Sequence, residues 1–248
     1  MIKMTFDKND PSSSWEKSQN VLVILAHPDD PEFFCGATLA RWALAGHMIH
    51  YILLTNGNKG GGSNVTPDKL RVIRKEEQQN AAAIIGVKSV SILQHEDGYL
   101  IPSMELRHEI VRLIRREKPE ILVTCDPTLL YSWNNRVNHP DHRAAGQAVL
   151  DAVFPAAGNS HFFPELIAQE GLKPHTPREV WVSLATQPSA ILDVSATWEI
   201  KINALKEHKS QIGDPLLFDK RMRARHSEDS TDTSPRYEEK FRVLNFSQ

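Results

Sequence analysis

"VLVILAHPDDPEFF", at residues 21–34, joins an apolar run directly to a group of ionisable side chains. Residues 21–26 are apolar throughout and rich in branched side chains, which is typical of a buried parallel strand. His27, Asp29, Asp30 and Glu32 then follow within six positions, and the two prolines among them disfavour an ordinary helix there. The stretch predicts a buried strand that ends in one imidazole and three carboxylates held close together.

The segments around this stretch alternate between strand and helix patterns. Apolar runs typical of strands recur at residues 48–55, 89–93, 120–126, 179–185 and 190–195. Helical spacing occurs at residues 36–47, 67–86, 104–119, 143–154 and 196–212. The alternation predicts an α/β fold, a Rossmann-like three-layer α/β/α sandwich with a mostly parallel sheet.

The domain organisation is predicted to be simple. No internal repeat and no convincing linker divides the chain, so residues 1–248 are expected to form a single domain. Residues 1–19 are polar and predict a loosely ordered N-terminal arm. Residues 213–248 give weak signals and predict an irregular C-terminal tail, a small extension of the domain.

Length and composition are those of an ordinary globular protein. A chain of 248 residues, with 40% hydrophobic and 24% charged residues, can bury a core without disulfide or metal support. The formal net charge of −2 gives no support for nucleic-acid binding. The two cysteines lie in apolar stretches and predict reduced, buried thiols. Neither a signal-peptide core nor a membrane-spanning run is present, which favours a cytoplasmic protein.

A second polar group, "NHPDHR" at residues 138–143, follows the fourth predicted strand. Ligands of open parallel sheets bind beyond the carboxyl ends of the strands, so both polar groups are expected at one edge. Imidazole and carboxylate suit zinc, whose catalytic sites use three protein ligands and lower the pKa of bound water to roughly 7. His27 with Asp29 or Asp30, and His139 or His142, are the candidate ligands, and the residues alone do not decide within each pair.

Each polar group also has a purely structural interpretation. Asp141 could simply cap the helix that starts beside it, and "HPDD" is a common turn sequence. Two such groups at strand ends of one sheet are a far rarer coincidence, which favours the metal site.

Several motifs taken together resemble a known family. "AHPDDPE", "CGATLA", "LLTNGNKGG", "IRKEE" and "HPDHR" are similar to the successive motifs of the LmbE-like (PIG-L) zinc-dependent N-acetylglucosaminyl deacetylases. The resemblance covers residues 20–211, since "KINALKEHKSQ" is similar to the family's closing helix. It implies that His27, Asp30 and His142 bind zinc and that Asp29 is the general base.

The resemblance also implies roles beside the metal. His139, paired with Asp141, would stabilise the tetrahedral intermediate or protonate the departing amine. Arg74 would hold the substrate, although a solvated helix charge is its structural alternative. The long connection at residues 126–138 departs from the family and predicts a substrate-lining loop with Tyr131 and Trp133.

Three further features are assigned supporting parts. Glu32 is expected to support the metal site by hydrogen bonding rather than to bind the metal. His208 is given a supporting role because its motif recurs in the family, and "NGNKGGGS" predicts a flexible rim loop rather than a phosphate cradle.

The predicted function is hydrolysis of an amide. A metal-dependent hydrolase would remove the acetyl group from an N-acetylated amino sugar or its conjugate through a zinc-bound hydroxide, with Fe²⁺ as an alternative metal. The expected partner is a small-molecule sugar, without nucleic acid or a membrane span, and a homo-oligomer is left open. Two rival hypotheses are an amidase for a larger sugar-thiol or other N-acyl conjugate, and a non-catalytic sugar- or nucleotide-binding Rossmann protein.

Overall fold

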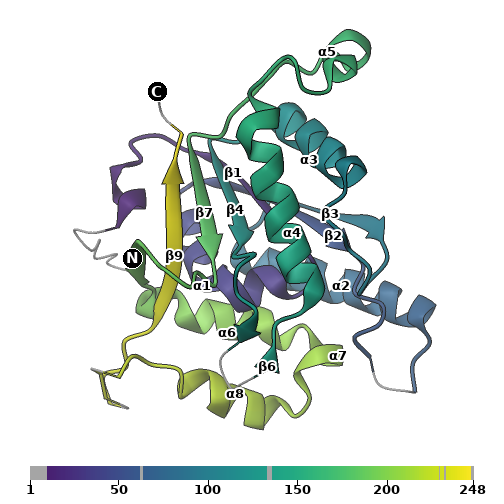
Figure 1. Cartoon of the computed structure of the whole chain (residues 1–248). Helices are drawn as coiled ribbons and strands as arrows, with labels where there is room; N and C mark the ends of the chain where they lie inside the picture. Colours follow the sequence, from purple (N-terminus) through teal and green to yellow (C-terminus); the bar gives the residue numbers. More distant parts are fainter. Residues whose placement is uncertain (1–9, 62–63, 133–135, 229, 232, 247–248) are drawn as a thin grey trace.

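A seven-stranded sheet in the order β3-β2-β1-β4-β7-β9-β8 forms the centre of the molecule (Figure 1). The computed structural model describes residues 10–61, 64–132, 136–228, 230–231 and 233–246. The strands of the sheet are β1 (Asn20–Leu25), β2 (Met48–Thr55), β3 (Ser89–His95), β4 (Ile121–Cys125), β7 (Glu179–Ser183), β8 (Ala190–Asp193) and β9 (Glu238–Asn245). The strands from β3 to β7 pair in parallel, whereas β9 pairs antiparallel with both of its neighbours.

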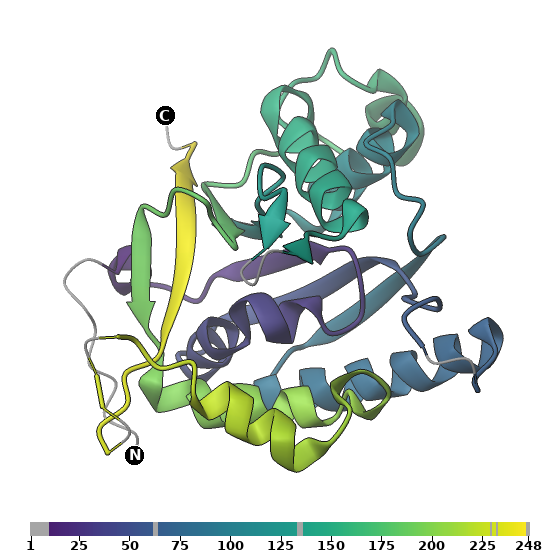
Figure 2. The same cartoon turned by 60° about the horizontal axis from the view of Figure 1, so that its bottom comes forward.

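Helices cover both faces of this sheet, as Figure 2 shows. The helices are α1 (Asp30–Leu44), α2 (Pro67–Ile85), α3 (Met104–Glu117), α4 (Pro140–Asp151), α5 (Pro164–Glu170), α6 (Trp198–Lys206), α7 (Lys209–Ile212) and α8 (Pro215–Arg223). Shorter elements are the 3-10 turns η1 (Pro11–Ser14) and η3 (Ser195–Thr197), the π-helical η2 (Ala152–Ala157), and a separate hairpin of β5 (Tyr131–Ser132) and β6 (Arg136–Val137). Helices α1, α2 and α6 pack on one face, and α3, α4 and η2 on the other. The predicted three-layer α/β/α architecture is confirmed.

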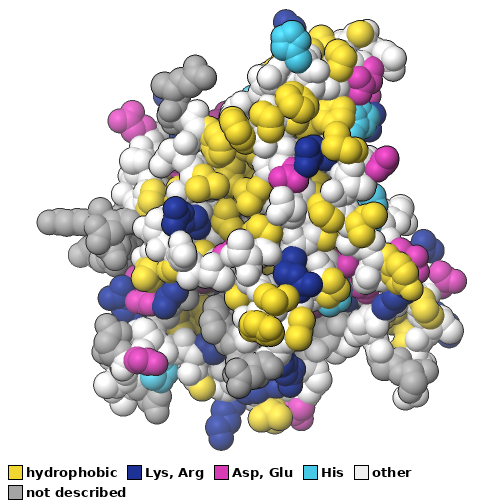
Figure 3. Space-filling view, in the orientation of Figure 1, with side chains coloured by type: hydrophobic (Ala, Val, Ile, Leu, Met, Phe, Trp, Pro, Cys, Tyr) yellow, Lys and Arg dark blue, Asp and Glu magenta, His cyan; other side chains and the backbone are white. Residues whose placement is uncertain are grey.

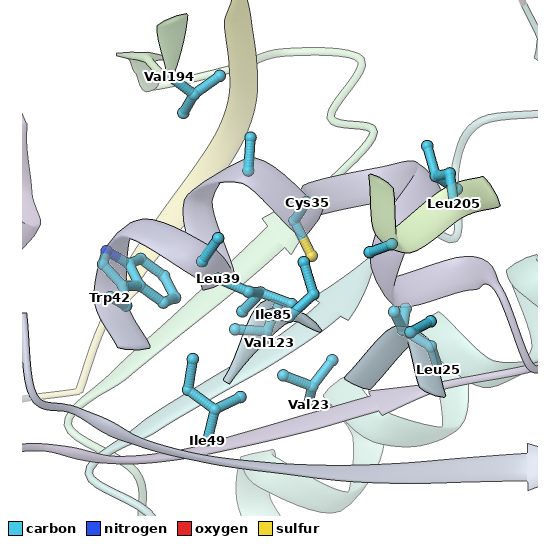
Figure 4. Close-up of a cluster of buried hydrophobic side chains, with 14 of the residues drawn as sticks. Val23, Leu25, Cys35, Leu39, Trp42, Ile49, Ile85, Val123, Val194 and Leu205 are labelled. Atoms are coloured by element: carbon cyan, nitrogen blue, oxygen red, sulfur yellow. The ribbon is translucent and has the colours of Figure 1, made fainter. Parts of the chain in front are cut away.

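The alternation of side chains along β1 builds the two cores. Val23 and Leu25 point to the layer of α1, where Figure 4 shows them near Leu39 and Cys35. The intervening residues of β1 contact the core under α3 and α4. Successive side chains of a strand point to opposite faces, so a strand covered on both faces is apolar throughout.

Helix α1 begins earlier than predicted. It starts at Asp30, so the expectation that the prolines keep the polar group outside a helix is wrong for Asp30 and Glu32. Pro31 lies in the first helical turn, where no backbone donor is needed, and its fixed φ suits that place. Asp29 precedes the helix in a left-handed conformation, with φ of 92°.

The C-terminal tail is not irregular, and that prediction is wrong for α8 and β9. β9 lies between β7 and β8, and its Glu239 is 4% exposed. Its carboxylate accepts the backbone N–H groups of Ala37 and Thr38, at 3.2 and 2.8 Å. These amides lie just after Cys35, where α1 leaves helical geometry (φ −150°, ψ 20°). The tail therefore stabilises a break in the helix that begins at the polar group.

The N-terminal arm is likewise packed on the body in the part that the structure describes. Asp10 is 2% exposed and pairs with Arg41 of α1. The ring of Trp15 lies 4.9 Å from that of Trp42, and its indole N–H donates to Glu179 at 3.1 Å. The prediction of a loose arm is therefore wrong for residues 10–15, because Trp15 is partly buried and packs against the core. Residues 1–9 lie outside the described residues.

Candidate metal centre

A pocket of about 490 Å³ opens at the carboxyl edge of the parallel strands, where both polar groups were expected. The loops that follow β1, β2, β3 and β4 all contribute to its wall. Its lining includes the predicted residues His27, Asp29, Asp30, Arg74, His139 and His142, and also Phe33, Phe34, Lys59, Asp97, Tyr99 and Gln211. The fold therefore brings together side chains that lie more than a hundred positions apart in the chain.

Asp30 lies between two imidazoles. Its Oδ1 is 3.0 Å from Nε2 of His142, and its Oδ2 is 3.5 Å from Nδ1 of His27. Ligand atoms around a tetrahedral zinc, each bound at 2.0–2.1 Å, are separated by about 3.3 Å. Both contacts of Asp30 are close to this separation, and imidazole and carboxylate are donors that suit a divalent cation.

The other nitrogen of each imidazole is already bonded. Nε2 of His27 lies 3.2 Å from Asp141 and 3.3 Å from Asp97, and Nδ1 of His142 lies 3.0 Å from Oδ1 of Asn138. A metal-binding histidine commonly donates its second N–H to a carboxylate or carbonyl, which fixes the ring and its tautomer. The remaining nitrogens face Asp30 and are free to bind a cation.

Two sets of donor atoms, with one atom from each residue, lie within 4.8 Å of one another. One comprises His27, His139 and His142, and the other His27, Asp97 and Asp141. His27 belongs to both, so it is the centre of the whole group. Asp97 and Asp141 use the nitrogen of His27 that points away from Asp30, as expected for carboxylates that orient a ligand.

The charges in the group are strongly coupled. Burial lowers the pKa of His27, but the carboxylates of Asp141, Asp30 and Asp97 outweigh burial and raise it well above its ordinary value. Burial raises the pKa of Asp30, but His142 and His27 together hold it well below its usual range. Three carboxylates around His27 thus create a strong preference for a positive charge at this place.

Asp29 is held beside the ligand group by helix α2. Its backbone N–H donates to Oε1 of Gln78 at 2.8 Å, and its carboxylate is 3.1 Å from the Arg74 guanidinium. A left-handed conformation is costly for a residue other than glycine, so these contacts maintain a strained backbone. Burial raises the pKa of Asp29 to about 6, although Arg74 acts in the opposite direction.

Arg74 is 3% exposed although it borders the pocket. Its guanidinium donates to the carbonyls of Gly57, at 2.6 Å, and Pro28. A Cβ at Gly57 would lie 2.4 Å from Arg74 Nη1, and Gly57 has φ of 62°, so this position requires glycine. The observed contacts of Arg74 fix the loops around Asp29, while contact with a substrate stays a prediction.

His139 and Asp141 are paired through the backbone rather than through the carboxylate. The N–H of Asp141 donates to Nδ1 of His139 at 3.2 Å, which leaves the ring proton of a neutral His139 on Nε2. Burial, and then the neighbouring His27 and His142, lower the pKa of His139. The Asp141 carboxylate bonds instead to His27 and to the amides of Gly98 and Leu100.

Comparison with known proteins places this site in a family. Residues 22–153 match the family model described as PIG-L, GlcNAc-PI de-N-acetylase. Diacetylchitobiose deacetylase from Thermococcus kodakarensis is 36% identical over 217 residues, which cover 87% of this chain and 78% of that protein. The chain belongs to the PIG-L family. The predicted resemblance to LmbE-like (PIG-L) deacetylases is thereby confirmed.

Two further likenesses extend the family assignment. An uncharacterized deacetylase of Escherichia coli is 31% identical over 199 residues, covering 80% of this chain and 95% of that protein. The solved structure of N,N'-diacetylchitobiose deacetylase from Pyrococcus horikoshii, in complex with its inhibitor MPG, has a TM-score of 0.83 at 25% identity. The matched region covers 95% of this chain and 87% of the Pyrococcus horikoshii chain.

Some site residues of this PIG-L chain were not predicted. Asp97 was missed although it follows β3 at the same edge of the sheet, so the strand-end rule would have found it. Gln78 was missed because its only local signal is its position four residues after Arg74 on one helix face. Gln78 also bonds to the fully buried Glu32, which His208 contacts at 3.2 Å, so Glu32 and His208 support the site through hydrogen bonds.

The prediction that Tyr131 of the loop at residues 126–138 lines the substrate pocket is wrong. Tyr131 is 69% exposed on the β5–β6 hairpin and is not among the described residues that line the pocket. Figure 3 shows hydrophobic side chains distributed over the face of the molecule that is seen in Figure 1. Trp133 lies outside the described residues.

Across the described chain, no helix has the length and apolar character needed to cross a bilayer.

Proposed function

We propose that this PIG-L chain is a metal-dependent deacetylase that hydrolyses the acetamide of an N-acetylated amino sugar. The observation that carries the proposal is the convergence of His27, Asp30 and His142 beside the carboxylate of Asp29 in one pocket. The similar deacetylase from Thermococcus kodakarensis, whose name specifies an N-acetylated sugar, supports this substrate class.

His27 through Nδ1, Asp30, and His142 through Nε2 would hold the metal. Zinc suits this donor set best, and Fe²⁺ is the alternative because the same ligands accept several divalent ions. When bound, such an ion lowers the pKa of water to roughly 7 and polarises a carbonyl group. Asp141 and Asn138 keep the two imidazoles in the orientation and tautomer that binding needs.

Asp29 would serve as the general base. With a pKa of about 6 it is ionised at neutral pH, yet it is basic enough to accept a proton from the attacking water. As the C–N bond breaks, the same carboxyl group can return its proton to the sugar nitrogen. The ion pair with Arg74 keeps the carboxylate in place during both transfers.

His139 would stabilise the negative charge that develops on the acetyl oxygen. Its Nδ1 accepts the Asp141 amide, so Nε2–H is the donor available to a substrate in the pocket. Its lowered pKa keeps the ring neutral near neutral pH, which favours hydrogen-bond donation over proton delivery. Of the two roles that the family resemblance implies for His139, these contacts favour stabilisation of the tetrahedral intermediate.

Acetate release tests the proposal. The purified protein is depleted with a chelator, reloaded with zinc or Fe²⁺, and assayed on N-acetylglucosamine and N,N'-diacetylchitobiose. Activity should disappear on depletion and return with metal. Asp29→Asn should keep its bound metal and lose about 100-fold or more in kcat.

Glu76→Gln, on the exposed side of α2, is the matched control and should retain wild-type activity. Full activity in the metal-depleted protein, or in Asp29→Asn, would contradict the mechanism.

A further inference from the structure

Tyr99 occupies the tip of the loop that follows β3, at the mouth of the pocket. Its exposed fraction is 68%, and it lines the pocket together with His139 and His142. A single exposed aromatic residue is common on protein surfaces and carries no meaning by itself. What distinguishes Tyr99 is the way in which its backbone and its ring are held.

A single buried carboxylate fixes the backbone on both sides of Tyr99. Asp141, which is 0% exposed, accepts the N–H of Gly98 at 2.7 Å and the N–H of Leu100 at 3.1 Å. Its Oδ2 also lies 3.2 Å from Nε2 of His27. The position of Tyr99 is therefore tied to the residue that orients the proposed metal ligand.

The ring is held from one side by Lys59. The ammonium group lies 3.9 Å from the ring centroid and 2.6 Å from Glu96, and the Lys59 backbone N–H donates to Asp97 at 2.8 Å. Lys59 thus lies over one face of the ring, while 68% of the residue is exposed. A tyrosine side chain has few rotatable bonds, so an exposed ring on a fixed backbone offers contact area at a low cost in conformational entropy.

We propose that Tyr99 forms a second sugar subsite, in which the ring next to the N-acetylated sugar packs its C–H face on the aromatic ring. The inference rests on the proposed deacetylase function and defines its substrate class as di- or oligosaccharides. Pyranose rings combine an apolar C–H face with hydroxyl groups at the edge, which suits an aromatic ring flanked by polar side chains. Lys59 and Gln211, which line the same pocket, supply those polar groups. A pocket of about 490 Å³ lies within the usual range for small-molecule ligands.

The ratio of kcat/KM for N,N'-diacetylchitobiose to that for N-acetylglucosamine tests the subsite. Tyr99→Ala should lower this ratio about 5- to 10-fold, mainly through a higher KM for the disaccharide. Tyr99→Phe and Tyr99→Trp should preserve the ratio because both retain an aromatic face. Tyr131→Ala is the matched control: Tyr131 is equally exposed, at 69%, and is not among the described residues of the pocket lining, so the ratio should not change.

Three results would overturn the subsite in an active enzyme. If Tyr99→Ala lowers kcat/KM equally on both sugars, or on neither, Tyr99 does not bind the second ring. A loss in Tyr99→Phe as large as in Tyr99→Ala would assign the effect to the phenolic hydroxyl. Wild-type protein that releases acetate from neither sugar would instead remove the deacetylase function, and the subsite with it.

Discussion

A group of buried charged side chains lies beside helix α1 at each of two points. The comparison of the two groups shows which features mark a functional site and which mark a structural ion pair. At the beginning of α1 lies the open cluster, consisting of His27, Asp30, Asp97, Asp141 and His142. At its break lies the closed pair, Lys201 and Glu239. Both groups are largely buried, so burial of charge does not by itself mark a functional site.

The two charges of the closed pair are opposite, and both side chains are hydrogen-bonded. The Lys201 ammonium donates to Glu239 at 2.6 Å and to the Phe33 carbonyl at 2.9 Å, and it lies 4.8 Å from the Trp198 ring centroid. Glu239 accepts the backbone N–H groups of Ala37 and Thr38, just after the break in α1. One positive and one negative charge therefore stabilise the chain at the break in α1.

The open cluster has an excess of carboxylates. Asp30, Asp97 and Asp141 all lie within 3.5 Å of the His27 imidazole, and the cluster faces the pocket. In the described ion pairs of this cluster, the positive partners of the carboxylates are His27 and His142. No lysine or arginine is among these described partners, whereas Lys201 pairs with Glu239. The candidate metal centre thus differs from the structural ion pair in two ways. Its carboxylates outnumber their positive partners, and its side chains line a pocket.

The largest expected effect separates the two groups directly. Asp30→Asn removes a charged ligand atom from the open cluster, so we expect loss of bound metal and about a thousandfold or greater fall in kcat/KM. Metal analysis and acetate release measure both. Glu239→Gln is the control for the closed pair and should keep its metal in the folded fraction; normal metal content in Asp30→Asn would refute the comparison.

A smaller effect, on stability, is expected at the closed pair. Lys201→Met leaves the Glu239 carboxylate buried without its cation and should lower the free energy of unfolding by about 3–5 kcal/mol. Lys201→Met/Glu239→Gln removes both charges and should recover at least about 1 kcal/mol of that loss. Urea denaturation followed by tryptophan fluorescence measures the three proteins. A double variant no more stable than Lys201→Met would show that the pair is not coupled.

The smallest effect concerns the pH dependence of the open cluster. A base with a pKa of about 6 must be ionised to act, so kcat/KM should fall about tenfold per pH unit below the pKa of Asp29. A bound cation nearby moves this limit to pH 6 or lower. Arg74→Gln removes the main charge that lowers the pKa of Asp29, so the limit should move to higher pH.

Arg71→Gln, on the exposed side of the same helix, is the control for this profile. It should leave the acid limit where it is in the wild-type protein. An unchanged limit in Arg74→Gln would show that the limiting group is not Asp29.

Much of the site was predictable because strand ends share one edge of a parallel sheet. His27 and Asp30 follow β1 directly, and His142 lies in the connection after β4, so their convergence follows from the strand pattern. Family resemblance, rather than any local pattern, distinguished Asp30 from Asp29 and His142 from His139. The distances now support that division, since the two free imidazole nitrogens face Asp30.

What the sequence by itself determined about this protein is the set of elements and the edge at which the polar residues meet, because apolar periodicity and turn residues act over a few neighbouring positions. Only the tertiary structure decided the partners of the charges. Asp141 contacts His27, 114 positions away, and Glu239 contacts α1 at a separation of 202 positions. Such pairings depend on how the strands are ordered in the sheet, and no local pattern records that order. The same physical reason explains why β9 and its buried glutamate were read as an irregular tail.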